Sequence, residues 1–140
     1  MNNADITLIS AATTEEGRDE TEFFTVGSFR QTDKGYEIKY GENAEVGYES
    51  CQVTMTILES SVLIERSMPA PTLLTVEKGK KHHMLYGTPY GDFMMGINAF
   101  EVDNKMTPEG GTLYLKYSID INSDFVSENE INLTVKVNEN

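Results

Sequence analysis

Five polar side chains fall on the apolar face of predicted β-strands, where they could bind a ligand: Tyr36, Tyr40, Arg66, His83 and Tyr117. Side chains two positions apart on a strand share a face, so the tyrosines lie in phase with Ile38 and Leu115, and Arg66 lies in phase with Val62 and Ile64. A buried polar group needs a partner, and guanidinium and phenol groups suit an acidic ligand. The alternative is that Tyr and Arg sit at strand ends and extend to the rim of the fold.

No arrangement of residues in the sequence predicts catalysis. Two metal ligands on a strand must be two residues apart to share a face, whereas His82 and His83 are adjacent. Cys51 alternates with Val53 and Met55, which predicts a small buried group rather than a nucleophile with a base beside it. We therefore expect no enzyme, no catalytic or metal site and no cofactor. An inward His83 is predicted to be a hydrogen-bonded core histidine, and the alternatives are a catalytic base or a ligand contact.

Ten short segments alternate between apolar and polar residues, with turn residues between them. This pattern predicts half-buried antiparallel strands in one all-β domain over residues 1–140, built as a sandwich or an up-and-down barrel of about eight to ten strands. Residues 11–22 lack this pattern and predict a loop or a short helical turn. The predicted strands are 6–10, 22–31, 36–40, 51–57, 61–66, 72–76, 82–86, 92–102, 112–122 and 131–137.

The segment YGTPYG predicts a β-hairpin turn. Proline suits the first position of a type I turn, and a following glycine with positive φ completes a three-residue loop over Pro89–Gly91. That loop length pairs Leu85 with Met95 and His83 with Ile97, so Leu85 and His83 are expected to point inward. A change of one residue in the loop would reverse this assignment.

Charge and composition limit the possible partners. The net charge of −12 disfavours binding to nucleic acid or to an anionic membrane surface, and no apolar run reaches the length of a membrane span. One cysteine and a start without a signal-peptide pattern predict a cytoplasmic location. The basic cluster EKGKKHH, residues 77–83, predicts a solvated hairpin tip or, alternatively, a contact with an anion or a partner.

Several of these motifs occur in an order that resembles a known family. The order is Y-x-I-x-Y, a strand ending in E-R, Y-G-T-P-Y-G, G-T-L-Y-L-K-Y-S-I-D-I-N and N-x-I-N-L-T-V-K-V, from Tyr36 to Val137. It resembles the YwiB family of small bacterial proteins, also called DUF1934, although SMPAPT after Arg66 departs from that family's pattern. The resemblance implies a calycin-like, or lipocalin-like, β-barrel with a candidate ligand site, and it implies no established activity.

Two functions follow as hypotheses. The first is a binding module that holds one small anionic or amphipathic molecule inside the barrel, with Arg66 as its polar anchor and Tyr36, Tyr40, His83 and Tyr117 around it. The second is a structural or regulatory interaction protein with a filled barrel. A continuous interior cavity would favour the first. The sequence leaves the oligomeric state open.

Overall fold

The chain folds into ten β-strands. The structure is a computed structural model that describes residues 2–42, 51–67 and 72–138, and no helix occurs in those ranges. The prediction of an all-β fold with about eight to ten strands is confirmed. The strands are β1 (Asn2–Thr14), β2 (Gly17–Gln31), β3 (Tyr36–Glu42), β4 (Cys51–Ile57), β5 (Ser61–Arg66), β6 (Thr72–Glu77), β7 (Lys81–Thr88), β8 (Gly91–Thr107), β9 (Gly110–Ile121) and β10 (Asp124–Val137).

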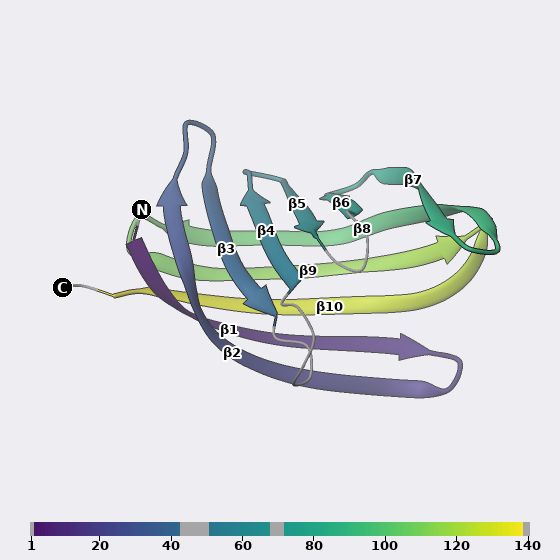
Figure 1. The fold of residues 1–140 in the computed structure, drawn as a ribbon, viewed down its shortest axis with the longest axis horizontal. Helices are drawn as coiled ribbons and strands as arrows, with labels where there is room; N and C mark the ends of the chain where they lie inside the picture. Colours follow the sequence, from purple (N-terminus) through teal and green to yellow (C-terminus); the bar gives the residue numbers. More distant parts are fainter. Residues whose placement is uncertain (1, 43–50, 68–71, 139–140) are drawn as a thin grey trace.

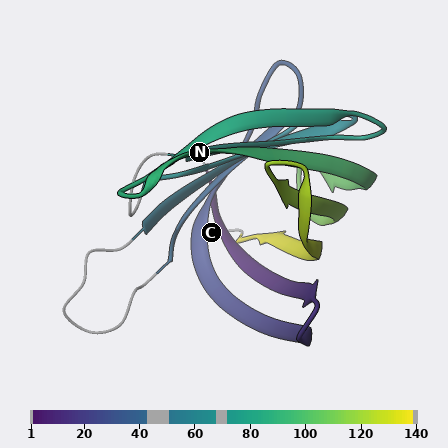
Figure 2. The same cartoon turned by 90° about the vertical axis from the view of Figure 1, so that its right-hand side faces the viewer.

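The strands form one antiparallel sheet that curls into a nearly closed barrel (Figures 1 and 2). The strand order is β6-β5-β4-β3-β2-β1-β10-β9-β8-β7, so all neighbours are consecutive in sequence except β1 and β10. The two terminal strands meet at what we call the β6–β7 seam. There the turn between β6 and β7 bonds to β8, with Gly79 N donating to Ala99 O at 3.2 Å and Ala99 N donating to Lys80 O at 3.3 Å.

Three of the hairpins share a Thr-x-x-Gly turn, over Thr14–Gly17, Thr88–Gly91 and Thr107–Gly110. In each turn the threonine pairs with the glycine, and the three glycines have φ of 125°, 124° and 113°. Residues with a Cβ rarely adopt such φ values, so glycine is required at these positions. The first of these turns corrects the prediction for residues 11–22, which are two strand segments joined by a two-residue turn.

The turn at Thr88–Gly91 also corrects the predicted register of β7 and β8. The positive φ of Gly91 is confirmed, but Gly91 pairs with Thr88 as a strand residue, so the loop contains two residues instead of three. The pairing therefore shifts by one, and Met84 pairs with Met95. The face assignment reverses as a result: His83 is exposed, and the side chain of Leu85 is 65% exposed.

The inward faces of the strands pack into one continuous apolar core. Phe29 is 1% exposed and stacks on Tyr36, with ring centroids 5.3 Å apart and an angle of 11° between the planes. Burial of such large side chains supplies most of the stabilisation of a barrel this size. The largest fully buried members are Phe29, Ile6, Ile38, Met55, Ile57, Ile97, Leu113, Leu115 and Leu133.

Strand β2 belongs to two parts of the wall. Its last residues, Ser28–Gln31, pair with Tyr36–Lys39 of β3, whereas residues 17–27 have β1 as their one partner among the described residues. The change occurs at Gly27, where an added Cβ would collide with the carbonyl oxygen of Lys39. We call this place the β2–β3 seam. Figure 1 shows β2 running along the lower edge of the molecule and then rising beside β3.

Candidate functional site

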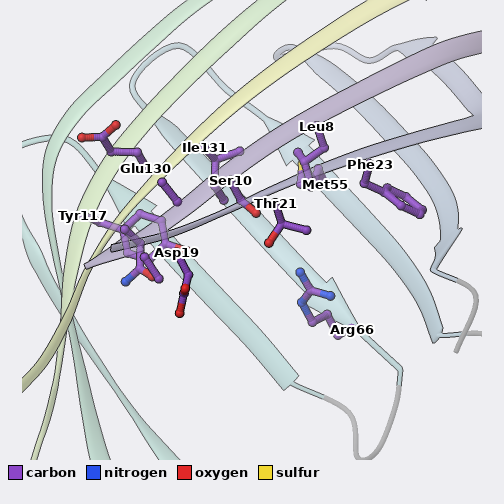
Figure 3. Close-up of a pocket in the computed structure, with 13 residues that line it drawn as sticks. Leu8, Ser10, Asp19, Thr21, Phe23, Met55, Arg66, Tyr117, Glu130 and Ile131 are labelled. Atoms are coloured by element: carbon purple, nitrogen blue, oxygen red, sulfur yellow. The ribbon is translucent and has the colours of Figure 1, made fainter. Parts of the chain in front are cut away.

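A pocket of about 500 Å³ lies between the β1–β2 hairpin and strands β4, β5, β9 and β10 (Figure 3). Its apolar wall includes Leu8, Phe23, Met55 and Ile131, and it is half-open to solvent. The volume lies within the range of roughly 300–1,000 Å³ that is typical of small-molecule sites. We call it the first hollow.

A smaller pocket of about 210 Å³, the second hollow, lies between β5, β6, β7, β8 and β9. Leu74 of β6, Met84 of β7 and Met95 of β8 line it, so it lies where β6 and β7 face each other. Unbranched methionine side chains adapt to ligands of different shape. The second hollow therefore suits an apolar group.

Arg66 and Tyr117 line both hollows. Arg66 is the last residue of β5, and in Figure 3 its guanidinium points across the first hollow towards Thr21 of β2. Tyr117 is 7% exposed, and burial raises the pKa of its phenol while the charge of Arg66 acts in the opposite direction. Tyr117 thus keeps its proton at neutral pH and can donate a hydrogen bond.

The other two predicted tyrosines face inward but line neither hollow. Tyr40 is 2% exposed and packs against Phe23, a residue of the first hollow, with ring centroids 6.0 Å apart. Tyr36 is half-buried against Phe29. Tyr40 therefore supports the wall of the first hollow through Phe23, whereas Tyr36 packs against a core residue that lines neither hollow.

His83 does not belong to the site, because the shifted register places it on the outer face of β7. The neighbouring His82 pairs with Ile97, and its Nε2 lies 2.9 Å from Oε1 of Glu77 on β6. This hydrogen bond is the largest cause of a lowered pKa of Glu77, followed by a hydrogen bond from Lys80. His82 thus helps to close the β6–β7 seam.

The basic cluster at residues 77–83 spans the turn from β6 to β7, and two of its lysines form ion pairs. Lys80 Nζ lies 3.2 Å from Glu77 Oε2, and Lys81 Nζ lies 2.7 Å from Asp120 Oδ2. The lysines at positions 78, 80 and 81 are exposed. The predicted exposure of these lysines is confirmed, but the predicted hairpin is wrong, because β6 and β7 are the two ends of the sheet and do not pair with each other. The side chain of Cys51 lies outside the described part of the chain.

Five polar residues of the first hollow were not predicted from the sequence: Ser10, Asp19, Thr21, Asn129 and Glu130. Three of them lie on the β1–β2 hairpin, where a strand was predicted as far as Ser10 and a loop or a helical turn over residues 11–22. Ser10 pairs with Thr21, and both are in phase with the inward residues of their strands. The recurrence of Thr-x-x-Gly at positions 14–17 is the signal that could have located this hairpin and these side chains.

Among the described residues, two carboxylates and one cation line the first hollow. Asp19 is exposed near the tip of the β1–β2 hairpin, while Glu130 points away from Arg66 in Figure 3, and its Oε2 lies 3.4 Å from Arg18 Nη2. Arg66 is the cation of this lining, at the end formed by β5 and β9.

The described residues contain no group of three or more His, Cys, Asp or Glu side chains that could hold a metal ion. They also contain no helix long and apolar enough to cross a membrane.

Comparisons with known proteins identify a family but no activity. A family model described as a domain of unknown function (DUF1934) matches residues 6–133. The crystal structure of the ywiB protein from Bacillus subtilis is similar, with a TM-score of 0.83 and 14% sequence identity over 99% of this chain and 93% of that one. At this identity, the similarity shows a shared fold. No curated protein matches the chain.

Proposed function

The chain belongs to the DUF1934 family, and from the geometry of its barrel we propose that it binds a small amphipathic anion between the two hollows. One observation carries the proposal: Arg66 and Tyr117 line both hollows, so a cation and a phenol lie where an apolar space meets a more polar one. The acidic group would bind at these two side chains. The fold alone supports no such statement, because one fold serves many functions.

The composition of each hollow assigns the parts of the ligand. An apolar chain fits the second hollow, which is lined by Met84, Met95 and Leu74. Hydroxyl and amide groups of Ser10, Thr21 and Asn129 in the first hollow suit the polar remainder. A carboxylate or phosphate matches the donor fork of a guanidinium, which remains charged at all physiological pH values.

The net charge of the protein explains why one inward arginine would matter. At −12 the surface repels anions at long range, so selective binding of an anion needs a local cation. A guanidinium at the boundary of an apolar hollow is screened less by salt than one in open solvent. We include a cytoplasmic location in the proposal, supported by the single cysteine of the chain.

A thermal-shift experiment with matched probes tests this function. Decanoate and decanol share a chain length and differ in charge. We expect decanoate at a hundredfold excess over its Kd to raise the melting temperature by about 5 °C or more, and decanol to have a much smaller effect. The variant Arg66→Gln should lose the response to decanoate, because it keeps a polar side chain but removes the charge.

Arg30→Gln is the matched control, because Arg30 lies on the outer face and pairs with Glu37. This variant should respond to decanoate as the wild type does. Equal shifts for decanoate and decanol, or an unchanged response in Arg66→Gln, would refute the anchor role of Arg66. The alternative of a barrel that acts through its surface predicts no shift with either probe.

A further inference from the structure

The outer edge of β2 is a long strand edge that no described strand covers. Residues 18–26 pair with β1 on one side, and β3 joins the other side only from Ser28 onward. Along such an edge, half of the backbone N–H and C=O groups point away from the sheet and can pair with another chain. Figure 1 shows this part of β2 as the lowest strand of the molecule.

Two large apolar side chains stand exposed on the outer face of this edge. Phe24 is 67% exposed and Val26 is 62% exposed, and the two are adjacent on that face because they are two positions apart. The edges of β6 and β7 differ, since these strands have six and eight residues and face each other across the β6–β7 seam. The edge of β2 combines length, exposure and apolar surface.

Charge distinguishes the two halves of the edge. Glu20 and Glu22 precede Phe24 on the same face, and Glu20 lies 3.7 Å from Arg18. Charged residues on an edge protect it against indiscriminate pairing, and they also select a partner of opposite charge. The acidic half is thus followed directly by an unprotected apolar half.

We propose that β2 receives an extended segment of a partner protein as an added antiparallel strand. The segment carries Lys or Arg opposite Glu20 and Glu22, and apolar residues opposite Phe24 and Val26. Main-chain hydrogen bonds supply affinity in this type of recognition, and the alternating side chains supply specificity. The site lies on the outside of the wall and is independent of the ligand proposed for the two hollows.

A second copy of this chain fits the edge less well. A two-fold antiparallel pairing that uses the whole edge, residues 18–26, is centred on Glu22 and would place the two Glu22 carboxylates side by side, and like charges directly opposite destabilise a sheet. It would also bring together two chains of net charge −12. A basic segment of another protein avoids both kinds of repulsion, so we take it as the partner.

Synthetic peptides test the proposal on the full chain. The capped peptide TVTVTKTKT places lysines opposite the two glutamates and valines opposite the apolar pair. We expect it to bind at least tenfold more tightly than TVTVTETET, as measured by isothermal titration calorimetry. A fully N-methylated TVTVTKTKT keeps its charges but donates no backbone hydrogen bond, and it should also bind at least tenfold more weakly.

Charge reversal on the protein gives the sharpest result. The double variant Glu20→Lys, Glu22→Lys should reverse the preference and bind TVTVTETET more tightly. The control Glu65→Lys, Glu101→Lys makes the same change of net charge on other exposed strand positions, and it should keep the wild-type preference. Arg66→Gln should bind the peptide normally, which separates this site from the interior one.

Three outcomes would overturn the proposal. The first is equal binding of both peptides to the wild type, or no binding of either. The second is loss of the preference in the control variant, which would show that net charge alone attracts the peptide. The third is a dimer in sedimentation equilibrium that Phe24→Lys dissociates, which would make a second copy the occupant of the edge.

Discussion

The β6–β7 seam and the β2–β3 seam both interrupt the barrel wall, but they are closed in different ways. At the β6–β7 seam the strands are short, and side chains and turn backbone bridge them, including the 2.9 Å contact between His82 and Glu77. At the β2–β3 seam four residue pairs close the wall, and Arg30 forms two hydrogen bonds of 3.0 and 3.1 Å with Glu37. Beyond these pairs the two strands separate.

The difference shows where the fold leaves room for other molecules. At the β6–β7 seam polar contacts within the chain join the two strands, and the second hollow lies behind them. At the β2–β3 seam the separation exposes Phe24 and Val26 on the outside and leaves the first hollow on the inside. The exposed edge of β2 and the first hollow therefore lie near the same interruption of the wall.

The largest expected effect is a difference in stability between substitutions in the two halves of β2. Phe29→Ala removes a side chain that is 1% exposed and stacks on Tyr36, so it should lower the free energy of unfolding by about 3–5 kcal/mol. Phe24→Ala, five positions earlier on the unpaired half, should change it by about 0.5 kcal/mol or less. Urea denaturation of both variants measures the contrast, and similar losses would mean that the edge of β2 is packed.

A substitution at Gly27 tests the place where β2 and β3 separate, and its expected effect is smaller. Gly27→Ala would direct a Cβ at the carbonyl oxygen of Lys39, so we expect a loss of about 1–3 kcal/mol in the free energy of unfolding. Ser28→Ala, the adjacent residue, is the control and should cost about 0.5 kcal/mol or less. A neutral Gly27→Ala would show that β3 does not approach β2 so closely.

The smallest expected effect is on the pH dependence of stability, and it compares one glutamate of each seam, Glu37 and Glu77. Hydrogen bonds from Arg30 lower the pKa of Glu37, and those from His82 and Lys80 lower the pKa of Glu77, relative to 4.5. A lowered pKa in the folded state stabilises the protein above pH 4.5, and this stabilisation is lost as pH falls through the folded pKa.

We therefore expect Glu37→Gln and Glu77→Gln each to lower the melting temperature slightly at pH 7, and both differences to shrink as the pH falls below 4.5. Thermal melts across this range measure the effect. A difference that persists unchanged at low pH would show that the lost contact does not depend on the carboxylate charge. A lower melting temperature in only one of the two variants would show that only the ion pair of that seam contributes to stability.

Alternation alone predicted the ten strands and the inward direction of Arg66 and Tyr117, because a period of two depends only on local residue types. It did not predict His83 correctly, since the direction of every side chain on β7 depended on the length of one turn. Gly91 was expected as the third loop residue and is instead the first residue of β8. A shift of one position was enough to exchange His83 and His82.

The polar wall of the first hollow was missed for a different reason. Ser10, Thr21 and Asn129 lie on strands that meet through the pairing of β1 with both β2 and β10. Serine, threonine and asparagine have no strong strand pattern of their own, and nothing local indicates that β10 returns to β1. The hollow is a product of strand order and bending, and neither is encoded in a short window of sequence.

The pairing of β1 with β10 has a kinetic consequence. It is the one ladder of the described sheet that joins distant parts of the sequence, and it extends to Asn138, whose N donates to Asn3 O at 2.9 Å. Loop closure over such a separation slows folding, because its entropy is lost before the contacts form. A circular permutant cut in the turn at Lys78–Lys80, with residues 138 and 3 linked, would be a continuous meander from β7 to β6. Its contact order would be lower, and it should refold faster than the native arrangement.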